Sequence, residues 1–531
     1  MRPSLIAVPC VAVLCSWCCA EVSAQDWGPN PPVELTYSPG TSHKVEPLTA
    51  DCDWPEWDAT IVGTTSADGT TKITNPDPVC VPTLSQTVTR ADALGQDTAY
   101  SFEHGGEIIF LFGDTIGATP GDGNGVDFAL WTTVQNPFAY QAGDTMAWST
   151  TRRAEDGIEL NYVLANGSDP RHALLVQPVY QTSQCYPDGS CGTALPMGAD
   201  DIPNSGISLD GQIYIVASSG TTSTANGHDH RTDYSVLTKF DPAAQTFAAG
   251  RTISSAADGG HFVYLSMREF PVIPGLRFPG INDDLVAIFG VGHYRQSNIY
   301  LSIVPRSGFE SGAGTLYYTG TDKLGFPTWG TSDHSTVQPV VTDLDPAMPT
   351  IGNRSVTYSQ QLGLWLMTFD GGRQPDPENP DSPGTAGVYF TFAAQPWGPW
   401  ATPQLIFNAC RDGAMGTYVF YYAKTAAANG CPSALPPDVT TFPAMTGPAG
   451  PTIGPQQAPG NPPLATRGGV YAPEMIERFT EVQGNTLKIY YTLSTWNPYA
   501  VVEMESDFQI TQERSSHVAA SLGPMAELVQ E

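Results

Sequence analysis

The chain has 531 residues, with 53 acidic and 23 basic side chains, so its formal net charge is −30. A chain this acidic repels phosphate backbones, which argues against nucleic-acid binding. Hydrophobic residues make up 41% and charged residues 14%, a composition that favours a buried core over disorder. The 53 glycines and 47 prolines favour many short strands joined by turns over long helices.

The N-terminus has the features of a secretory signal peptide. Arg2 precedes an apolar run over residues 5–20, and small residues follow at Val22–Ala24. This order predicts a signal peptide over residues 1–24 and a secreted mature protein that begins at Gln25, although a buried core helix is an alternative interpretation. No later segment reaches the ~20 apolar residues of a membrane helix, so no membrane span is expected.

Cysteine usage agrees with an oxidising compartment. Four cysteines fall within the predicted signal peptide, and the other six form no CxxC pair, which argues against zinc. An even number of cysteines predicts disulfides, and sequence proximity suggests three local pairs, although six cysteines allow fifteen connectivities. The suggested pairs are Cys52–Cys80, Cys185–Cys191 and Cys410–Cys431.

In chain order, residues 25–95 are predicted to form an N-terminal extension that wraps the main domain. Five units follow, each with an apolar run, a short polar loop and a partner strand. The five apolar runs are Glu107–Phe112, Gln212–Ala217, Leu285–Gly290, Leu364–Phe369 and Leu487–Thr492. Nearly continuous apolar runs are typical of strands covered on both faces, so we expect these to be the innermost strands.

Five similar β units favour a ring of sheets, because radial repetition protects sheet edges. The fold class predicted is therefore all-β: a five-bladed β-propeller over residues 96–510, with long loop insertions and the N-terminal extension. A β-sandwich is the alternative. Residues 432–468, rich in proline and glycine, are expected to form a surface loop, and residues 511–531 a C-terminal tail.

The densest group of candidate site residues surrounds the first apolar run. Asp97, Glu103 and His104 precede it, and Asp114 follows it. Two carboxyl groups with different pKa values are what acid/base cleavage of a glycosidic bond requires. The alternative is structural: Asp114 caps a turn and Asp97 binds local backbone amides.

A second group lies between two predicted strands of the third unit. His293, Tyr294 and Arg295 could bind a sugar, since Arg donates to hydroxyl groups and a Tyr ring packs on a sugar face. The alternative is a hairpin connection with an arginine ion pair. Asp370, which ends the fourth apolar run, could also face the ring axis.

A third group belongs to the fifth unit. Glu474 lies in a short apolar segment, and Trp496 and Asn497 interrupt a β pattern, as a sugar-binding platform would. The alternative for Trp496 is packing between blades. No cofactor or bound metal is expected; the segment Asp122–Asp127 faintly resembles a structural calcium loop but lacks the full alternation and the terminal Glu. His228–His230 fits a polar turn better than a metal site.

Four motifs in order resemble a known family. They are Phe102–Gly106, Leu111–Thr115, Gly292–Ser297 and Tyr491–Tyr499. Together they resemble the group described as domain of unknown function 4185, which is associated with glycoside hydrolase family 183, endo-D-arabinanases on a five-bladed propeller. The resemblance spans residues 90 to 510, and the chain departs from it at residues 409–468 and Glu474.

The resemblance implies endo-hydrolysis of D-arabinan, the furanose polymer of arabinogalactan and lipoarabinomannan, with Asp97 and Asp114 as the catalytic pair. One aspartate would protonate the leaving oxygen and the other would act as base or nucleophile. The leading hypothesis is therefore a secreted glycoside hydrolase with a polysaccharide substrate. The alternatives are a non-catalytic carbohydrate-binding propeller, such as a lectin or adhesin, and a surface interaction domain.

Overall fold

The protein is described here from a computed structural model. The described residues are 33–53, 81–117, 143–164, 179–181, 194–196, 200–220, 232–248, 250–256, 259–270, 281, 283–334, 336–344, 349–372, 386–414, 418–419, 469–496 and 499–512. The predicted signal peptide, the proline-rich segment 432–468 and the segment Asp122–Asp127 lie outside them, as do His228–His230 and Asn497.

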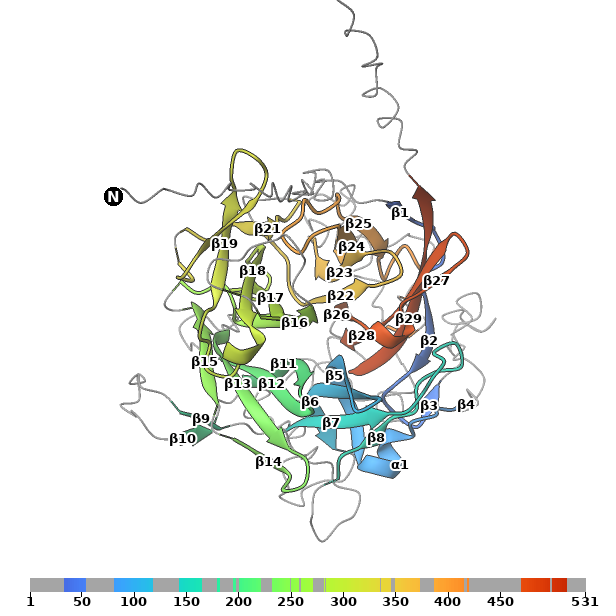
Figure 1. Cartoon of the computed structure of the whole chain (residues 1–531). Helices are drawn as coiled ribbons and strands as arrows, with labels where there is room; N and C mark the ends of the chain where they lie inside the picture. Colours follow the sequence, from blue (N-terminus) through green and yellow to red (C-terminus); the bar gives the residue numbers. More distant parts are fainter. Residues whose placement is uncertain are drawn as a thin grey trace, which may run out of the picture.

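Five antiparallel sheets make up most of the described chain (Figure 1). The first contains β5 (Ala93–His104), β6 (Glu107–Gly117), β7 (Gly143–Ser149) and β8 (Asn161–Tyr162). The second contains β11 (Asp200–Leu209), β12 (Gln212–Gly220), β13 (Thr232–Asp241), β14 (Thr246–Phe247) and β15 (Arg251–Ser255). The third contains β16 (Tyr264–Phe270), β17 (Leu285–Val291), β18 (Ile299–Pro305), β19 (Leu316–Thr321), β20 (Pro327–Gly330) and β21 (Pro339–Val341).

The fourth sheet contains β22 (Arg354–Ser359), β23 (Leu364–Gly371), β24 (Gly387–Ala393) and β25 (Gln404–Phe407). The fifth contains β26 (Gly469–Met475), β28 (Thr486–Trp496), β29 (Ala500–Gln512) and β1 (Val33–Tyr37), with β2 (His43–Pro47) and β27 (Glu481–Gln483) at its edges. Smaller elements are β3 (Cys52–Asp53), β4 (Val81–Pro82), α1 (Thr87–Ala91), β9 (Val179–Gln181), β10 (Ala194–Pro196) and the 3₁₀ turns Arg306–Gly308 and Glu477–Phe479.

The five sheets are the blades of a closed ring. The first strand of each blade contacts the first strand of the next, in the cyclic order β5, β11, β16, β22, β26 and back to β5. Figure 1 is viewed along the axis of the ring and shows these five strands nearest its centre. The prediction of an all-β, five-bladed propeller is confirmed.

The predicted order of strands within a blade is wrong. The apolar runs lie in β6, β12, β17, β23 and β28, which are the second strands and not the innermost ones. A second strand is covered on both faces by the neighbouring blades, and all seven residues of β17 are buried. The innermost strands carry polar residues such as Asn204 and Arg354, so they lack an apolar run.

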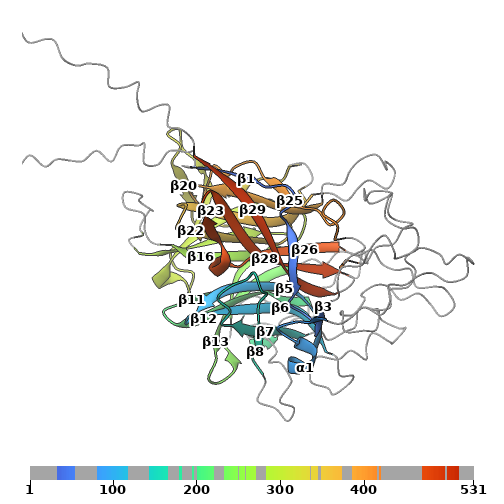
Figure 2. The ribbon, with the colours of Figure 1, turned by 90° about the vertical axis from the view of Figure 1, so that its right-hand side faces the viewer.

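Strands from the N-terminal part of the chain complete the fifth blade. β1 and β2 both pair with β29, so part of the segment expected to wrap the propeller belongs to its sheet (Figure 2). Gln404 of the fourth blade joins this edge strand, since its side chain accepts from the Tyr37 N–H and donates to the Leu35 carbonyl, each at 2.8 Å. The ring is thus closed by a strand that precedes all five blades in the sequence.

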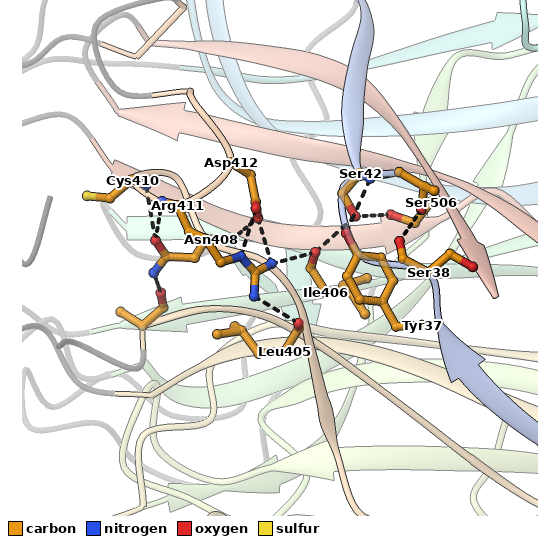
Figure 3. A network of polar contacts seen from close by, with 12 residues as sticks. Tyr37, Ser38, Ser42, Leu405, Ile406, Asn408, Cys410, Arg411, Asp412 and Ser506 are labelled. Atoms are coloured by element: carbon orange, nitrogen blue, oxygen red, sulfur yellow. Dashed lines mark hydrogen bonds and ion pairs between the residues drawn. The ribbon is translucent and has the colours of Figure 1, made fainter. Parts of the chain in front are cut away.

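A polar network also connects the fourth blade to the N-terminal segment at the edge of the fifth blade (Figure 3). The Ser42 hydroxyl donates to the Ile406 carbonyl at 3.0 Å, and the Arg411 guanidinium donates to that carbonyl at 3.0 Å and to Asp412 at 2.7 Å. Cys410, beside Arg411, is disulfide-bonded. The pairing of the six cysteines outside the signal peptide stays a prediction.

Aromatic side chains fill the interfaces between blades. Phe390 of the fourth blade packs on Phe508 of the fifth, with ring centroids 4.0 Å apart, and Phe289 of the third packs on Trp365 of the fourth at 5.8 Å. Because the apolar core lies between blades, the polar ends of the innermost strands stay available at the hub. Within the described part of the chain, no helix has the length and apolar character needed to cross a membrane.

Candidate active site

Asp97 and Asp114 lie on paired strands at one end of the first blade. Asp97 is near the start of β5, and its partner in the register is Gly113 of β6, the residue before Asp114. This end of each blade carries the start of the innermost strand and the end of the second strand. The two aspartates expected to be catalytic thus lie at the same end of one pair of strands, and their catalytic role stays a prediction.

The backbone around the pair is irregular. The β5–β6 register shifts on both sides of Asp97, and Thr98, Ala99 and Asp114 have φ values of 63°, 69° and 36°. A left-handed conformation costs a non-glycine residue about 1–3 kcal/mol and persists where the surrounding structure enforces it, commonly at active sites. Bulges of this kind redirect side chains from the regular alternation of a strand.

Gly113 makes room for the Asp97 carboxyl group. A Cβ atom at residue 113 would lie 2.6 Å from Asp97 Oδ1, far closer than van der Waals contact allows. On the other side of the bulge, the Asp114 N–H donates to Asp144 Oδ1 at 3.0 Å. Gly113 and the Asp114–Asp144 hydrogen bond thus help to position the two candidate aspartates.

Asp97 is held by two tyrosines of the fifth blade. The Tyr471 hydroxyl donates to Asp97 Oδ2 at 2.9 Å, and Tyr499 supplies a second side-chain hydrogen bond. The residue is 6% exposed, and its buried Oδ1 has no hydrogen-bond partner among the described residues. Burial raises the pKa of Asp97 to about 6, against the opposing effect of the two hydroxyl groups. This carboxyl group can carry a proton at mildly acidic pH.

Arg295 and Asp370 form an ion pair close to this carboxyl. Arg295, in the loop between β17 and β18, donates from Nε and Nη2 to Asp370 Oδ2 at 3.3 and 3.2 Å. The guanidinium also lies 4.9 Å from the Tyr294 ring centroid, and the charge of Asp97 contributes to the raised pKa of Tyr294, of which burial is the main cause. Three blades therefore contribute to one polar cluster.

Asp370 connects the third, fourth and fifth blades. Besides Arg295, it accepts from the Asn353 N–H at 2.6 Å and from the backbone of Ala472, the residue after Tyr471. Gly352 leaves space for it, since a Cβ there would lie 2.6 Å from Asp370 Oδ2. Burial raises the pKa of Asp370, and Arg295 opposes that shift. Asp370 therefore fixes Arg295 while the arginine side chain stays 46% exposed.

Glu103 and His104 do not join the site, contrary to expectation. They lie at the hairpin end of β5, six residues beyond Asp97, which is about 20 Å along a strand. Glu103 is paired with Arg478, and His104 Nδ1 is 2.9 Å from the Ser208 hydroxyl. Their proximity to Asp97 is one of sequence alone.

The other predicted site residues have different positions. Glu474 is buried on β26, three residues beyond Tyr471, where it bonds Ser355 and faces Arg354; burial raises its pKa well above the usual range. His293 is exposed in the loop that carries Arg295. Trp496 is the last residue of β28, at the same end of its blade as Asp97.

Tyr471, Tyr499 and Asp144 were not among the predicted site residues. Tyr471 and Tyr499 lie in segments singled out for other residues, Glu474 and Trp496, and Asp144 follows no apolar run. A tyrosine at the start of an innermost strand is the signal that could have revealed Tyr471. No cluster of three or more His, Cys, Asp or Glu side chains able to hold a metal occurs among the described residues.

Fold and site together define a five-bladed β-propeller with a pair of aspartates at one end of its hub. The chain belongs to the family called domain of unknown function (DUF4185), whose model matches residues 84–505. The resemblance to the DUF4185 group is thereby confirmed, and the association with glycoside hydrolase family 183 stays a prediction. No curated protein matches the sequence.

Several solved structures are similar over most of the chain. The native arabinanase of Bacillus subtilis has 10% identity and a TM-score of 0.32, covering 78% of this chain and 96% of its own. A protein of unknown function from Dyadobacter fermentans has 11% identity and a TM-score of 0.34, covering 80% and 96%. An endo-1,5-α-L-arabinanase from Thermotoga petrophila has 10% identity and a TM-score of 0.32, covering 79% and 74%.

Proposed function

We propose that this protein is a secreted glycoside hydrolase that cleaves furanosidic linkages within a polysaccharide, with D-arabinan as its substrate. The observation that carries the proposal is the Asp97–Asp114 pair at the hub. Asp97 is buried, has a pKa of about 6, and its Oδ1 has no hydrogen-bond partner in the described part of the chain. Asp114 directly follows Gly113, the residue that pairs with Asp97 across the two strands.

In the proposed reaction, Asp97 is the general acid. Its carboxyl proton passes to the glycosidic oxygen as the bond from that oxygen to the anomeric carbon breaks. Asp114 carries the negative charge, either as base toward the attacking water or as nucleophile toward the anomeric carbon. Water supplies the hydroxyl group of the new reducing end. Tyr471 and Tyr499 limit the rise in the pKa of Asp97, so that the group also ionises near neutral pH.

Arg295 is the proposed substrate-positioning residue. Asp370 engages Nε and Nη2, which leaves Nη1 to donate to a sugar hydroxyl or ring oxygen. Because Asp370 neutralises its charge, the pair favours a neutral glycan over an anionic one. A neutral polysaccharide is also the substrate that a protein with a net charge of −30 does not repel.

The test is product analysis with the mature protein on a panel of D-arabinan, L-arabinan and fructans. We expect oligosaccharides from the interior of D-arabinan, and loss of at least 99% of the activity in Asp97→Asn and Asp114→Asn. Asp210→Asn is the matched control, because Asp210 lies in the β11–β12 turn at the opposite end of its blade, paired with Arg306. Binding of D-arabinan without new reducing ends would replace the hydrolase by a carbohydrate-binding propeller.

A further inference from the structure

A histidine–aspartate pair lies at the same end of the ring, between the second and third blades. His261 precedes the innermost strand β16, and Asp333 follows β20. His261 Nδ1 lies 2.9 Å from Asp333 Oδ1, and the His261 backbone N–H donates to Oδ2 of the same carboxylate at 3.0 Å. The Ser254 hydroxyl, from β15, donates to Oδ2 at 2.8 Å.

These contacts fix both the orientation and the tautomer of the imidazole. A carboxylate only accepts hydrogen bonds, so the proton of the neutral ring resides on Nδ1 and Nε2 becomes an acceptor. The Tyr300 ring packs against the imidazole, with centroids 4.1 Å apart, and holds its plane. The histidine side chain is 24% exposed and Asp333 is 11% exposed.

Nε2 has no role in the internal contacts of the fold. The described residues give it no hydrogen-bond partner, whereas Asp333 is satisfied by Ser254 and by the backbone and ring of His261. An aspartate that only anchored the loop would need the backbone N–H and the serine alone. The oriented ring adds one acceptor of fixed direction at a partly exposed position.

The pair adjoins the candidate active site through a single loop. A Cβ at Gly292 would lie 2.7 Å from the Gly260 carbonyl and 3.6 Å from His261 Cα, so the two backbones are in direct contact. The loop from Gly292 continues to Tyr294 and Arg295, and the Tyr294 ring lies 5.5 Å from that of Tyr264 in β16. His261 thus stands one loop away from the Arg295–Asp370 pair.

We propose that His261 forms a distal sugar-binding subsite, in which Nε2 accepts a hydrogen bond from a hydroxyl of a sugar unit away from the scissile bond. This inference rests on the proposed hydrolase function and gives its substrate a length: several linked units that span from Asp97 to His261. A neutral polyhydroxylated ligand suits the site, because an acceptor beside Asp333 attracts hydroxyl groups and repels anions.

The experiment compares substrates of two lengths in His261→Ala and His261→Phe, the second of which keeps a ring against Tyr300. We expect kcat/KM on long D-arabinan oligosaccharides to fall about three- to tenfold, as for loss of one neutral hydrogen bond. A short aryl furanoside that occupies only the cleavage position should be hydrolysed at the parent rate. His104→Ala is the matched control, since His104 bonds Ser208 at the opposite end of the ring.

Binding measured by calorimetry in the Asp97→Asn background separates this subsite from catalysis. In that background, His261→Phe should weaken the binding of long oligosaccharides by the same factor, and the unfolding temperature should stay unchanged. Equal effects on short and long substrates, or none on either, would overturn the subsite and leave the hydrolase intact. A parent protein that neither binds nor cleaves any furanoside would overturn both proposals.

Discussion

The hydrogen bond from Tyr471 to Asp97 gives the proposed acid a measurable signature. Tyr471→Phe removes the hydroxyl that donates to Oδ2 at 2.9 Å but keeps the ring in place. Because that hydroxyl lowers the pKa of Asp97 against the larger effect of burial, its loss must raise the pKa further above about 6. Tyr499 remains as the second donor.

The size of the shift follows from the strength of the lost bond. A hydrogen bond to a charged group contributes about 1.5–3 kcal/mol, and each pKa unit corresponds to 1.36 kcal/mol, so we expect the pKa to rise by about one to two units. A general acid must be protonated, and the rate falls as pH rises through its pKa. The alkaline limb of kcat/KM against pH should therefore move upward by that amount.

The assay is kcat/KM on a short furanoside from pH 4 to 9, for the parent, Tyr471→Phe and Tyr214→Phe. Tyr214 is the matched control, because it lies near the start of β12, away from Asp97, and its hydroxyl bonds Glu310 between β18 and β19. A shift of the acidic limb instead would make Asp97 the base or nucleophile and reverse the two roles. An unchanged profile, or a downward shift, would refute the reasoning about Tyr471.

Three further predictions concern packing, binding and pH-dependent stability. Gly113→Ala drives a methyl group into Asp97 Oδ1 and the Ile202 side chain, so kcat should fall at least tenfold while the cost in stability stays near the ~1–3 kcal/mol of overpacking. A parent-like kcat would contradict the fit described above. Asp370→Asn frees Arg295 and should raise KM more than it lowers kcat, which steady-state kinetics on long oligosaccharides will show. Burial raises the pKa of Glu46 from 4.5 to about 7, so its stabilising contribution is complete below about pH 4.5 and is lost as pH rises toward 7, by about 3 kcal/mol. Urea unfolding from pH 4.5 to 7.5 should show this loss in the parent and less of it in Glu46→Gln. An identical dependence of the unfolding free energy on pH in the two proteins would contradict it.

The five-fold repetition could be predicted from sequence because second strands are covered on both faces and read as apolar runs. The innermost strands could not be predicted, because buried polar residues such as Asn204 and Arg354 break the hydrophobic pattern that marks a strand. The same cause placed the wrong strand at the axis. The fold class was insensitive to that error because either assignment gives five blades.

The candidate site was predictable only where sequence neighbours are also spatial neighbours. Asp97 and Asp114 flank one hairpin, so a single register fixes their proximity. The prediction that Glu103 joins the site was wrong, because each residue along a strand adds about 3.3 Å and Glu103 lies six residues beyond Asp97. Tyr471 lies 374 residues from Asp97 in the sequence, and ring closure alone brings them together.

Ring closure and the proposed chemistry are therefore linked. Asp97 belongs to the first blade, whereas Tyr471 and Tyr499, which lower its pKa against the larger effect of burial, belong to the fifth. The fifth blade in turn depends on β1 from the N-terminal part of the chain for its outer strand. A chain that ended its last blade without this strand would leave β29 with an open edge and β26 less firmly placed against β5. Any resulting loss of the Tyr471 and Tyr499 hydrogen bonds would raise the pKa of Asp97, although every residue of the first blade would be in place.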